Sequence, residues 1–174
     1  MYTVYGPEVN KAVQSDLDKI TETILSKIDP VSIILFGGFG KGEGSIEVTD
    51  GAIIPLNDYD LYVVTNGQIS DSRMEKIGML CSSSINVGGL DFVEHPSEEY
   101  DKNKFFHVDL RSLDYNNLNK LLPTQRTFEL KNSSQIIWGK DITPEIPDVK
   151  VSKSDALRLL FNKCDHLLLG SNKS

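Results

Sequence analysis

The sequence predicts a mixed α/β (α+β) protein with a short mixed β-sheet, helices mainly on one face of the sheet, and a further helix at the C-terminus. Apolar residues recur at helical spacing near both ends of the chain, and short apolar runs lie between them. The clearest run is VSIILFGG at 31–38. A continuous apolar run that ends in glycine is typical of a buried strand. The 174 residues are enough for one domain with a proper core.

The composition excludes several classes of protein. The chain is 39% hydrophobic and 25% charged, which is an ordinary balance for a soluble protein. A net charge of -7 makes long nucleic acids and anionic membranes unfavourable partners. Cys81 and Cys164 are too few and too far apart for a disulfide framework or a zinc site. Without a signal pattern or a long apolar run, the sequence favours a cytoplasmic protein with reduced thiols.

The first half of the chain predicts a helix, a buried strand, a glycine-rich turn, a second strand and a second helix. The first helix starts at Pro7, a residue favoured in a first helical turn, and stops before Pro30. After the strand at 31–38 the chain makes a polar excursion and enters the strand at 55–64. A weaker helix follows over 70–83.

The second half predicts two strands, at 85–95 and 104–113, and then a helix that Pro123 must kink or split. A short strand is expected at 134–139, and the two prolines after it indicate a linker. Ser152 then caps an amphipathic helix whose apolar stripe needs a partner. We therefore expect a domain at 1–149, and at 150–174 the start of a helical segment that continues in a longer protein.

The strand at 55–64, PLNDYDLYVV, carries two aspartates where strands rarely have them. Side chains alternate along a strand, so Asp58 and Asp60 project from the same face, about 7 Å apart along the chain. Two carboxylates this close are unfavourable unless a cation lies between them. Solvated aspartates, or a turn cap after Asn57, are the structural alternative.

The glycine-rich stretch GGFGKGEGS at 37–45 follows the buried strand directly. Glycines let a backbone approach a ligand closely, and exposed backbone N–H groups suit phosphate oxygens. Lys41 would add a positive charge. The stretch is neither a P-loop nor GxGxxG, and a glycine-rich hairpin is the structural alternative. Together with the paired aspartates, however, it indicates metal-assisted phosphoryl or nucleotidyl transfer, because divalent metals there need hard oxygen ligands from adjacent carboxylates.

The residues LFGGFGKGEGS…NDYDLYVV resemble the motif of the DNA polymerase β-type nucleotidyltransferase superfamily, and TFELK…IIWGKDI resembles the tail of its stand-alone bacterial and archaeal domains. The resemblance implies the nucleotidyltransferase fold. It implies that Gly37, Gly38 and Lys41 face a triphosphate and that Asp58 and Asp60 bind Mg²⁺ or Mn²⁺. The spacer between the two motifs is longer here than in compact members, which predicts a small inserted hairpin.

The superfamily also needs a third carboxylate, which completes a metal site and can act as a base. Asp91 in GGLDFVEH and Asp109 in FFHVDLRSL are the two candidates. Distance along the chain favours Asp91. The resemblance of VDLRSL to the end of the family's catalytic strand favours Asp109, and two glycines before Asp91 suggest a bend. We predict Asp109 as the third metal ligand, with Asp91 as the alternative.

The expected activity is transfer of a nucleoside monophosphate from an NTP, with ATP as the first candidate, to an acceptor with release of pyrophosphate. The acidic chain favours a small molecule or a protein as acceptor over a long nucleic acid, and no membrane partner is expected. The rival hypothesis is a non-catalytic binding or antitoxin-like regulatory module with the same fold. Neither the acceptor nor the oligomeric state follows from the sequence.

Overall fold

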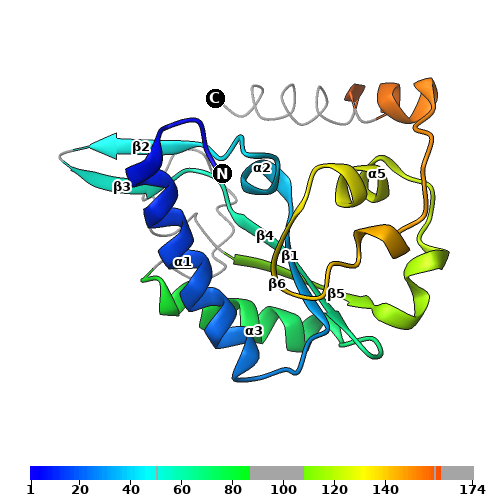
Figure 1. Cartoon of the computed structure of the whole chain (residues 1–174), viewed down its shortest axis with the longest axis horizontal. Helices are drawn as coiled ribbons and strands as arrows, with labels where there is room; N and C mark the ends of the chain where they lie inside the picture. Colours follow the sequence, from blue (N-terminus) through cyan, green and yellow to red (C-terminus); the bar gives the residue numbers. More distant parts are fainter. Residues whose placement is uncertain (50, 87–107, 159, 162–174) are drawn as a thin grey trace, which may run out of the picture.

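A central four-stranded mixed sheet organises the chain (Figure 1). The structure is a computed structural model that describes residues 1–49, 51–86, 108–158 and 160–161. The strands have the order β5-β4-β1-β6, and β1 runs antiparallel to both of its neighbours, whereas β4 and β5 are parallel. This confirms the predicted mixed sheet and α+β class. Their bounds are β1 Ser32–Leu35, β4 Tyr59–Thr65, β5 Val108–Asp114 and β6 Gln135–Gly139.

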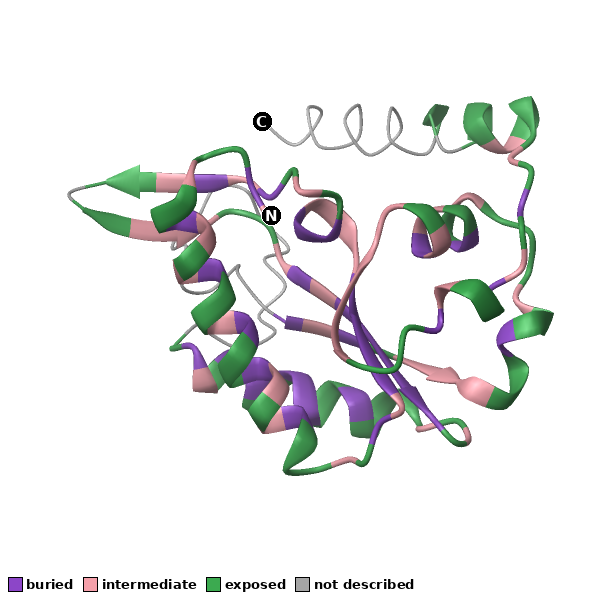
Figure 2. Cartoon of the chain, viewed as in Figure 1, coloured by how far each residue is buried: buried purple, intermediate pink, exposed green. Residues whose placement is uncertain are grey.

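The two long helices cover one face of this sheet. Helix α1, Pro7–Leu25, and helix α3, Asp71–Ser84, pack against it and against each other (Figures 1 and 2). Pro7 lies in the first turn of α1, as the sequence predicted, where its missing N–H has no intrahelical partner to lose. The buried stripe of α1 consists of Val9, Val13, Leu17, Ile20 and Ile24.

The opposite face is also covered, so the expectation of helices mainly on one face was incomplete. It carries the 3₁₀ helix η1, Tyr115–Lys120, helix α5, Gln125–Asn132, and the 3₁₀ helix η2, Thr143–Glu145. Pro123 lies between η1 and α5, so the predicted helix is split in two. The second apolar cluster comprises Ile34, Tyr62, Val64, Leu118, Leu130, Ile142 and Ile146.

The prediction of a linker after β6 is wrong. Ile142 is fully buried and Ile146 is 1% exposed, and both pack against the second face of the sheet. Two prolines in a short polar stretch indicated a linker, but the two isoleucines bury enough apolar surface to dock it. This segment therefore belongs to the folded core.

The predicted inserted hairpin is confirmed. Strand β2, Ile46–Thr49, pairs antiparallel with β3, Ala52–Pro55, and the pair forms a separate two-stranded sheet. It lies between the glycine-rich stretch and β4 and projects away from the central sheet (Figure 1). The inserted hairpin therefore leaves the antiparallel pairing of β1 with β4 intact.

The C-terminal helix begins as predicted. The Ser152 hydroxyl accepts a hydrogen bond from the backbone N–H of Asp155 at 3.1 Å, and the Asp155 carboxylate accepts one from the backbone N–H of Ser152 at 3.3 Å. Leu157, Leu160 and Phe161 are exposed. No helix in the described parts of the chain is both long enough and apolar enough to cross a membrane. The division at 149/150 stays a prediction, and the expected strand at 85–95, with Asp91, lies outside the described residues beyond Asn86.

Candidate functional site

Two of the predicted metal ligands lie side by side at one end of the sheet. In the parallel pairing of β4 with β5, Asp60 is directly opposite Asp109, and Tyr62 is opposite Arg111. Directly paired residues of neighbouring strands point to the same face of a sheet. Tyr62 belongs to the second apolar cluster, so all four side chains share the face that carries α5. Asp58 precedes Asp60 by two residues, just before β4 begins.

The glycine-rich stretch packs closely against this carboxylate pair. It forms a five-residue helix, α2, Gly37–Lys41, rather than the open turn predicted from the sequence. Gly37 has a φ of +66°, and a Cβ atom there would lie 2.2 Å from Oδ2 of Asp60. Real Cβ atoms essentially never come that close, so a side chain at Gly37 would strain the backbone and force the Asp60 carboxylate to move. Gly37 therefore leaves room for the Asp60 side chain. The role predicted for Gly37 was a different one, contact with a phosphate.

Gly38 approaches a different side chain. A Cβ atom at Gly38 would lie 3.4 Å from Oδ1 of Asn57, and that same oxygen accepts a hydrogen bond of 2.7 Å from the backbone N–H of Ser45. Asn57 therefore ties the end of the glycine-rich stretch to the entrance of β4. The sequence offered a hint of this, because asparagine before a strand often binds nearby backbone.

Lys41 is positioned by α5. Its Nζ lies 2.8 Å from Oε1 of Glu129, and the Lys41 side chain is 31% exposed. The ion pair joins the glycine-rich helix to the second face of the sheet. A phosphate group would have to share or replace Glu129 as the partner of Lys41, and the predicted contact of Lys41 with a triphosphate stays a prediction.

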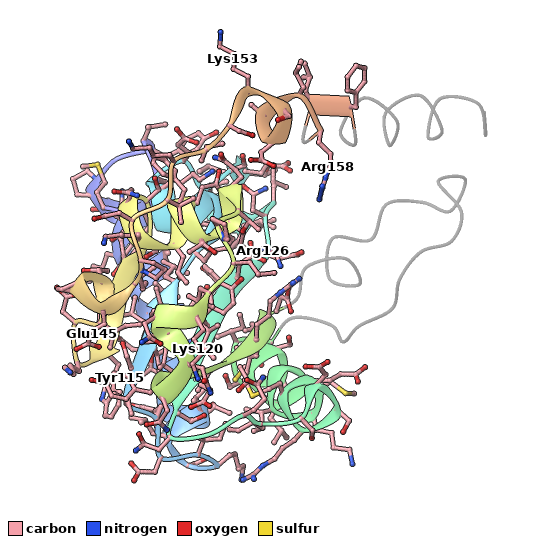
Figure 3. All side chains as sticks on the ribbon, turned by 90° about the vertical axis from the view of Figure 1, so that its right-hand side faces the viewer. Tyr115, Lys120, Arg126, Glu145, Lys153 and Arg158 are labelled. Atoms are coloured by element: carbon pink, nitrogen blue, oxygen red, sulfur yellow. The ribbon has the colours of Figure 1, made fainter. Side chains whose placement is uncertain are left out.

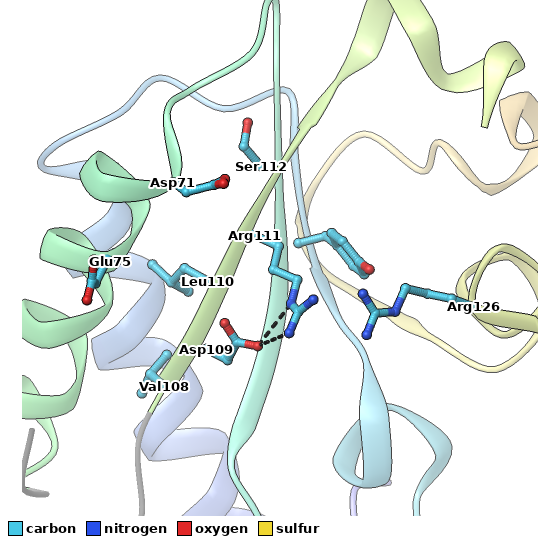
Figure 4. A pocket seen from close by; sticks show the side chains of 9 residues that line it. Asp71, Glu75, Val108, Asp109, Leu110, Arg111, Ser112 and Arg126 are labelled. Carbon is cyan, nitrogen blue, oxygen red and sulfur yellow. Dashed lines mark hydrogen bonds and ion pairs between the residues drawn. The ribbon is translucent and has the colours of Figure 1, made fainter. Parts of the chain in front are cut away.

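Asp109 is held by Arg111, two residues further along β5. Both Nε and Nη2 of Arg111 donate to Oδ2 of Asp109, at 2.9 and 2.8 Å (Figure 4). The pair is partly exposed, with 49% of the Arg111 side chain and 29% of the Asp109 side chain accessible. The hydrogen bonds from Arg111 to Asp109 raise the pKa of the guanidinium further above its usual range. The sequence analysis did not single out Arg111, although its i, i+2 spacing from Asp109 was a usable signal.

A cavity of about 520 Å³ opens beside this ion pair, along β5, which is an outer strand of the sheet among the described residues. Figure 4 shows Asp71 and Glu75 of α3 on one side of β5, and Arg111 and Arg126 on the other. Tyr62 lines the same cavity. Burial raises the pKa of Tyr62, and the charges of Arg126 and Arg111 oppose that effect. From the sequence, Arg126 could reach a triphosphate or an acceptor, but a solvated helix face was the favoured interpretation.

The oxygen ligands that the site offers meet only part of what a hard divalent cation needs. Asp60 and Asp109 supply carboxylate oxygens from adjacent positions on one face, and Asp58 lies at the same end of β4. Among the residues that the structure describes, however, no three acidic, histidine or cysteine side chains form a group arranged to hold a metal ion. Both hydrogen bonds from Arg111 go to Oδ2 of Asp109, and Oδ1 is the second oxygen of this carboxylate. A metal would therefore have to compete with Arg111 or use that second oxygen.

The fold and the site together define a mixed α/β domain with strand-paired carboxylates beside a glycine-rich helix. Comparison with known protein families, curated proteins and solved structures gives no match for this chain. The interpretation of the site therefore depends on its own geometry and chemistry.

Proposed function

We propose that the protein is a metal-dependent nucleotidyltransferase of the DNA polymerase β type, which moves a nucleoside monophosphate from an NTP to a small-molecule or protein acceptor. The register of two paired strands is the observation that supports the proposal most strongly. The parallel register of β4 and β5 brings Asp60 beside Asp109, although the two residues are far apart in the sequence. The close approach of Gly37 to Asp60 adds to it, because it joins the two sequence motifs in one place.

Each residue has a separate task in this proposal. Asp58, Asp60 and Asp109 would hold Mg²⁺ or Mn²⁺, which supplies charge neutralisation at the reacting phosphate. Gly37 leaves space for the Asp60 carboxylate, so the backbone of α2 stays close to the site, while Gly38 of the same short helix lies beside Asn57. Lys41 lies on that same short helix and would exchange its contact with Glu129 for a phosphate oxygen. A carboxylate of the group could accept the proton of the acceptor hydroxyl.

The test is transfer of label from α-labelled NTPs to a panel of small-molecule and protein acceptors, with Mg²⁺ or Mn²⁺ present. We expect Asp60→Asn and Asp109→Asn to abolish the transfer. Asp18→Asn provides a control of equal charge change, because Asp18 is an exposed residue of α1. Transfer that survives in both site variants, or that falls equally in the control, would overturn the proposal.

A second candidate function has a specific observation in its favour. The ion pair between Arg111 and Asp109 occupies the carboxylate that catalysis needs, and such a pair suits a binding or regulatory module that uses the fold without a metal. The two candidates differ in metal dependence. Thermal stabilisation by NTPs that requires Mn²⁺ or Mg²⁺ favours the enzyme, whereas stabilisation that is equal in a chelator favours the module.

A further inference from the structure

Two arginines line the cavity beside β5, and one of them, Arg111, is paired with the proposed metal ligand Asp109. Arg111 comes from β5 and Arg126 from α5, and both line the same cavity with Tyr62. In Figure 4 the guanidinium groups of Arg111 and Arg126 lie near one another on the same side of β5. Two like charges repel each other, and the Asp109 carboxylate already offsets Arg111 through their ion pair, so Arg126 is the group that an added anion would offset.

Arg111 has donors to spare. Its Nε and one Nη2–H are directed at a single oxygen of Asp109. A guanidinium group carries more N–H donors than one carboxylate oxygen can accept, and about half of the Arg111 side chain is accessible. An anion in the cavity can therefore bind Arg111 without first breaking the contact with Asp109.

Arg126 is the second donor, and through its charge and a side-chain hydrogen bond it opposes the rise that burial causes in the pKa of Tyr62. It is an exposed residue near the start of α5, and it lies on the side of the molecule that faces the viewer in Figure 3. The neighbouring group on the cavity wall is Tyr62, whose buried ring is held by a T-shaped contact with Phe36. The Tyr62 hydroxyl can itself donate a hydrogen bond to an anion.

We propose that Arg111, Arg126 and the Tyr62 hydroxyl form a binding site for a phosphate group at the β5 edge of the sheet. Arginine is suited to this ligand because its planar donors match phosphate oxygens in pairs. The cavity volume of about 520 Å³ lies within the usual range for small-molecule sites and leaves room for the rest of a phosphorylated ligand. Asp71 and Glu75 come from the other side of β5, so they do not face the two guanidinium groups directly.

The phosphate has two possible sources, the triphosphate of the NTP or a phosphorylated acceptor. The assignment to either one rests on the proposed function, whereas phosphate binding itself does not. The site lies next to Asp109, so a bound phosphate would be close to the proposed metal ligands in both cases.

The experiment is calorimetric titration of the full chain with inorganic pyrophosphate in EDTA, so that no metal contributes. We expect Arg126→Gln to weaken pyrophosphate binding about tenfold, the loss of about 1.4 kcal/mol typical of one charge-assisted contact. Arg126→Lys should weaken it less, because the charge stays while the paired donors are lost. Arg73→Gln is the matched control, since the Arg73 guanidinium binds the carbonyl of Lys27 outside the cavity.

Two further titrations distinguish the sources of the phosphate. A loss of ATP binding in Arg126→Gln with unchanged binding of a sugar monophosphate assigns the site to the donor, and the reverse assigns it to the acceptor. Equal losses for both ligands support a site that takes either one. If wild type does not bind pyrophosphate, or if Arg126→Gln binds it as tightly as wild type, the proposal is wrong. If the wild-type protein binds pyrophosphate but transfers no labelled NMP to any acceptor of the panel, the proposed function alone is overturned.

Discussion

Replacing Gly37 by alanine tests the connection between the glycine-rich helix and the carboxylate pair. The added Cβ would lie 2.2 Å from Oδ2 of Asp60, so the carboxylate must move. Gly51 offers a matched control, because it also has a positive φ, +81°, but a Cβ there meets nothing within 4 Å. Both substitutions carry backbone strain, and only the one at Gly37 displaces a side chain.

The expected magnitudes follow from these two terms. Alanine at left-handed φ costs roughly 1–2 kcal/mol. It regains about 0.4–1 kcal/mol by restricting the unfolded chain. Gly51→Ala should therefore lower the free energy of unfolding by about 1 kcal/mol. Moving the Asp60 side chain off its rotamer adds about 0.5–1.5 kcal/mol, so Gly37→Ala should cost about 2 kcal/mol.

Urea denaturation measures the free energy of unfolding, and titration with Mn²⁺ measures the metal affinity of the same two variants. We expect Gly37→Ala to lose most of its Mn²⁺ affinity and Gly51→Ala to keep it. The reasoning is refuted if the two variants are equally stable and bind Mn²⁺ as wild type does. A loss of stability in Gly37→Ala with unchanged Mn²⁺ affinity would confirm the packing and reject Asp60 as a metal ligand.

Three further predictions concern the metal, the second face of the sheet and a partly buried carboxyl. The double variant Asp58→Asn/Asp60→Asn should lose metal-dependent NTP binding in a thermal-shift assay and keep its fold, because both side chains lie at the sheet end outside the apolar clusters. Ile142→Ala should lower the free energy of unfolding in urea by about 2–5 kcal/mol, because Ile142 is 0% exposed. Burial raises the pKa of Asp16 above its ordinary value of 3.8, against the opposing hydrogen bond from Tyr59. The folded protein then binds the proton more tightly than the unfolded chain does. The free energy of unfolding therefore falls as the pH rises from 3.8 to the raised pKa. Asp16→Asn should remove this fall in urea denaturation experiments across the same pH window.

Each of these predictions has an outcome that contradicts it. Mg-NTP binding by the double aspartate variant at wild-type affinity would place the metal site elsewhere. Leu122→Ala is the control for Ile142→Ala, since Leu122 is 73% exposed and should change stability by no more than about 0.5 kcal/mol. Equal effects of the two would mean that the segment after β6 is not docked. For Asp16, a pH dependence that is unchanged in the asparagine variant would show that another group titrates.

Local patterns in the sequence determined the elements that depend on near neighbours. The stripe of α1, the split at Pro123 and the Ser152 cap arise from contacts within a few residues, and they appear in the structure as expected. The prediction that Asp58 and Asp60 share one face comes in the same way from the two-residue period of a strand, although β4 itself begins only at Tyr59. These features need no knowledge of which strands pair.

Only the tertiary structure decided which distant residues meet. The register of β4 with β5 places Asp60 opposite Asp109, and a shift of one residue would have turned Asp109 to the other face. Strand register depends on the packing of both faces of the sheet, and neither strand's own periodicity encodes it. For the same reason the ion pair of Lys41 with Glu129 and the approach of Arg126 to the β5 edge came from the structure, because each joins residues that only the folded sheet brings together.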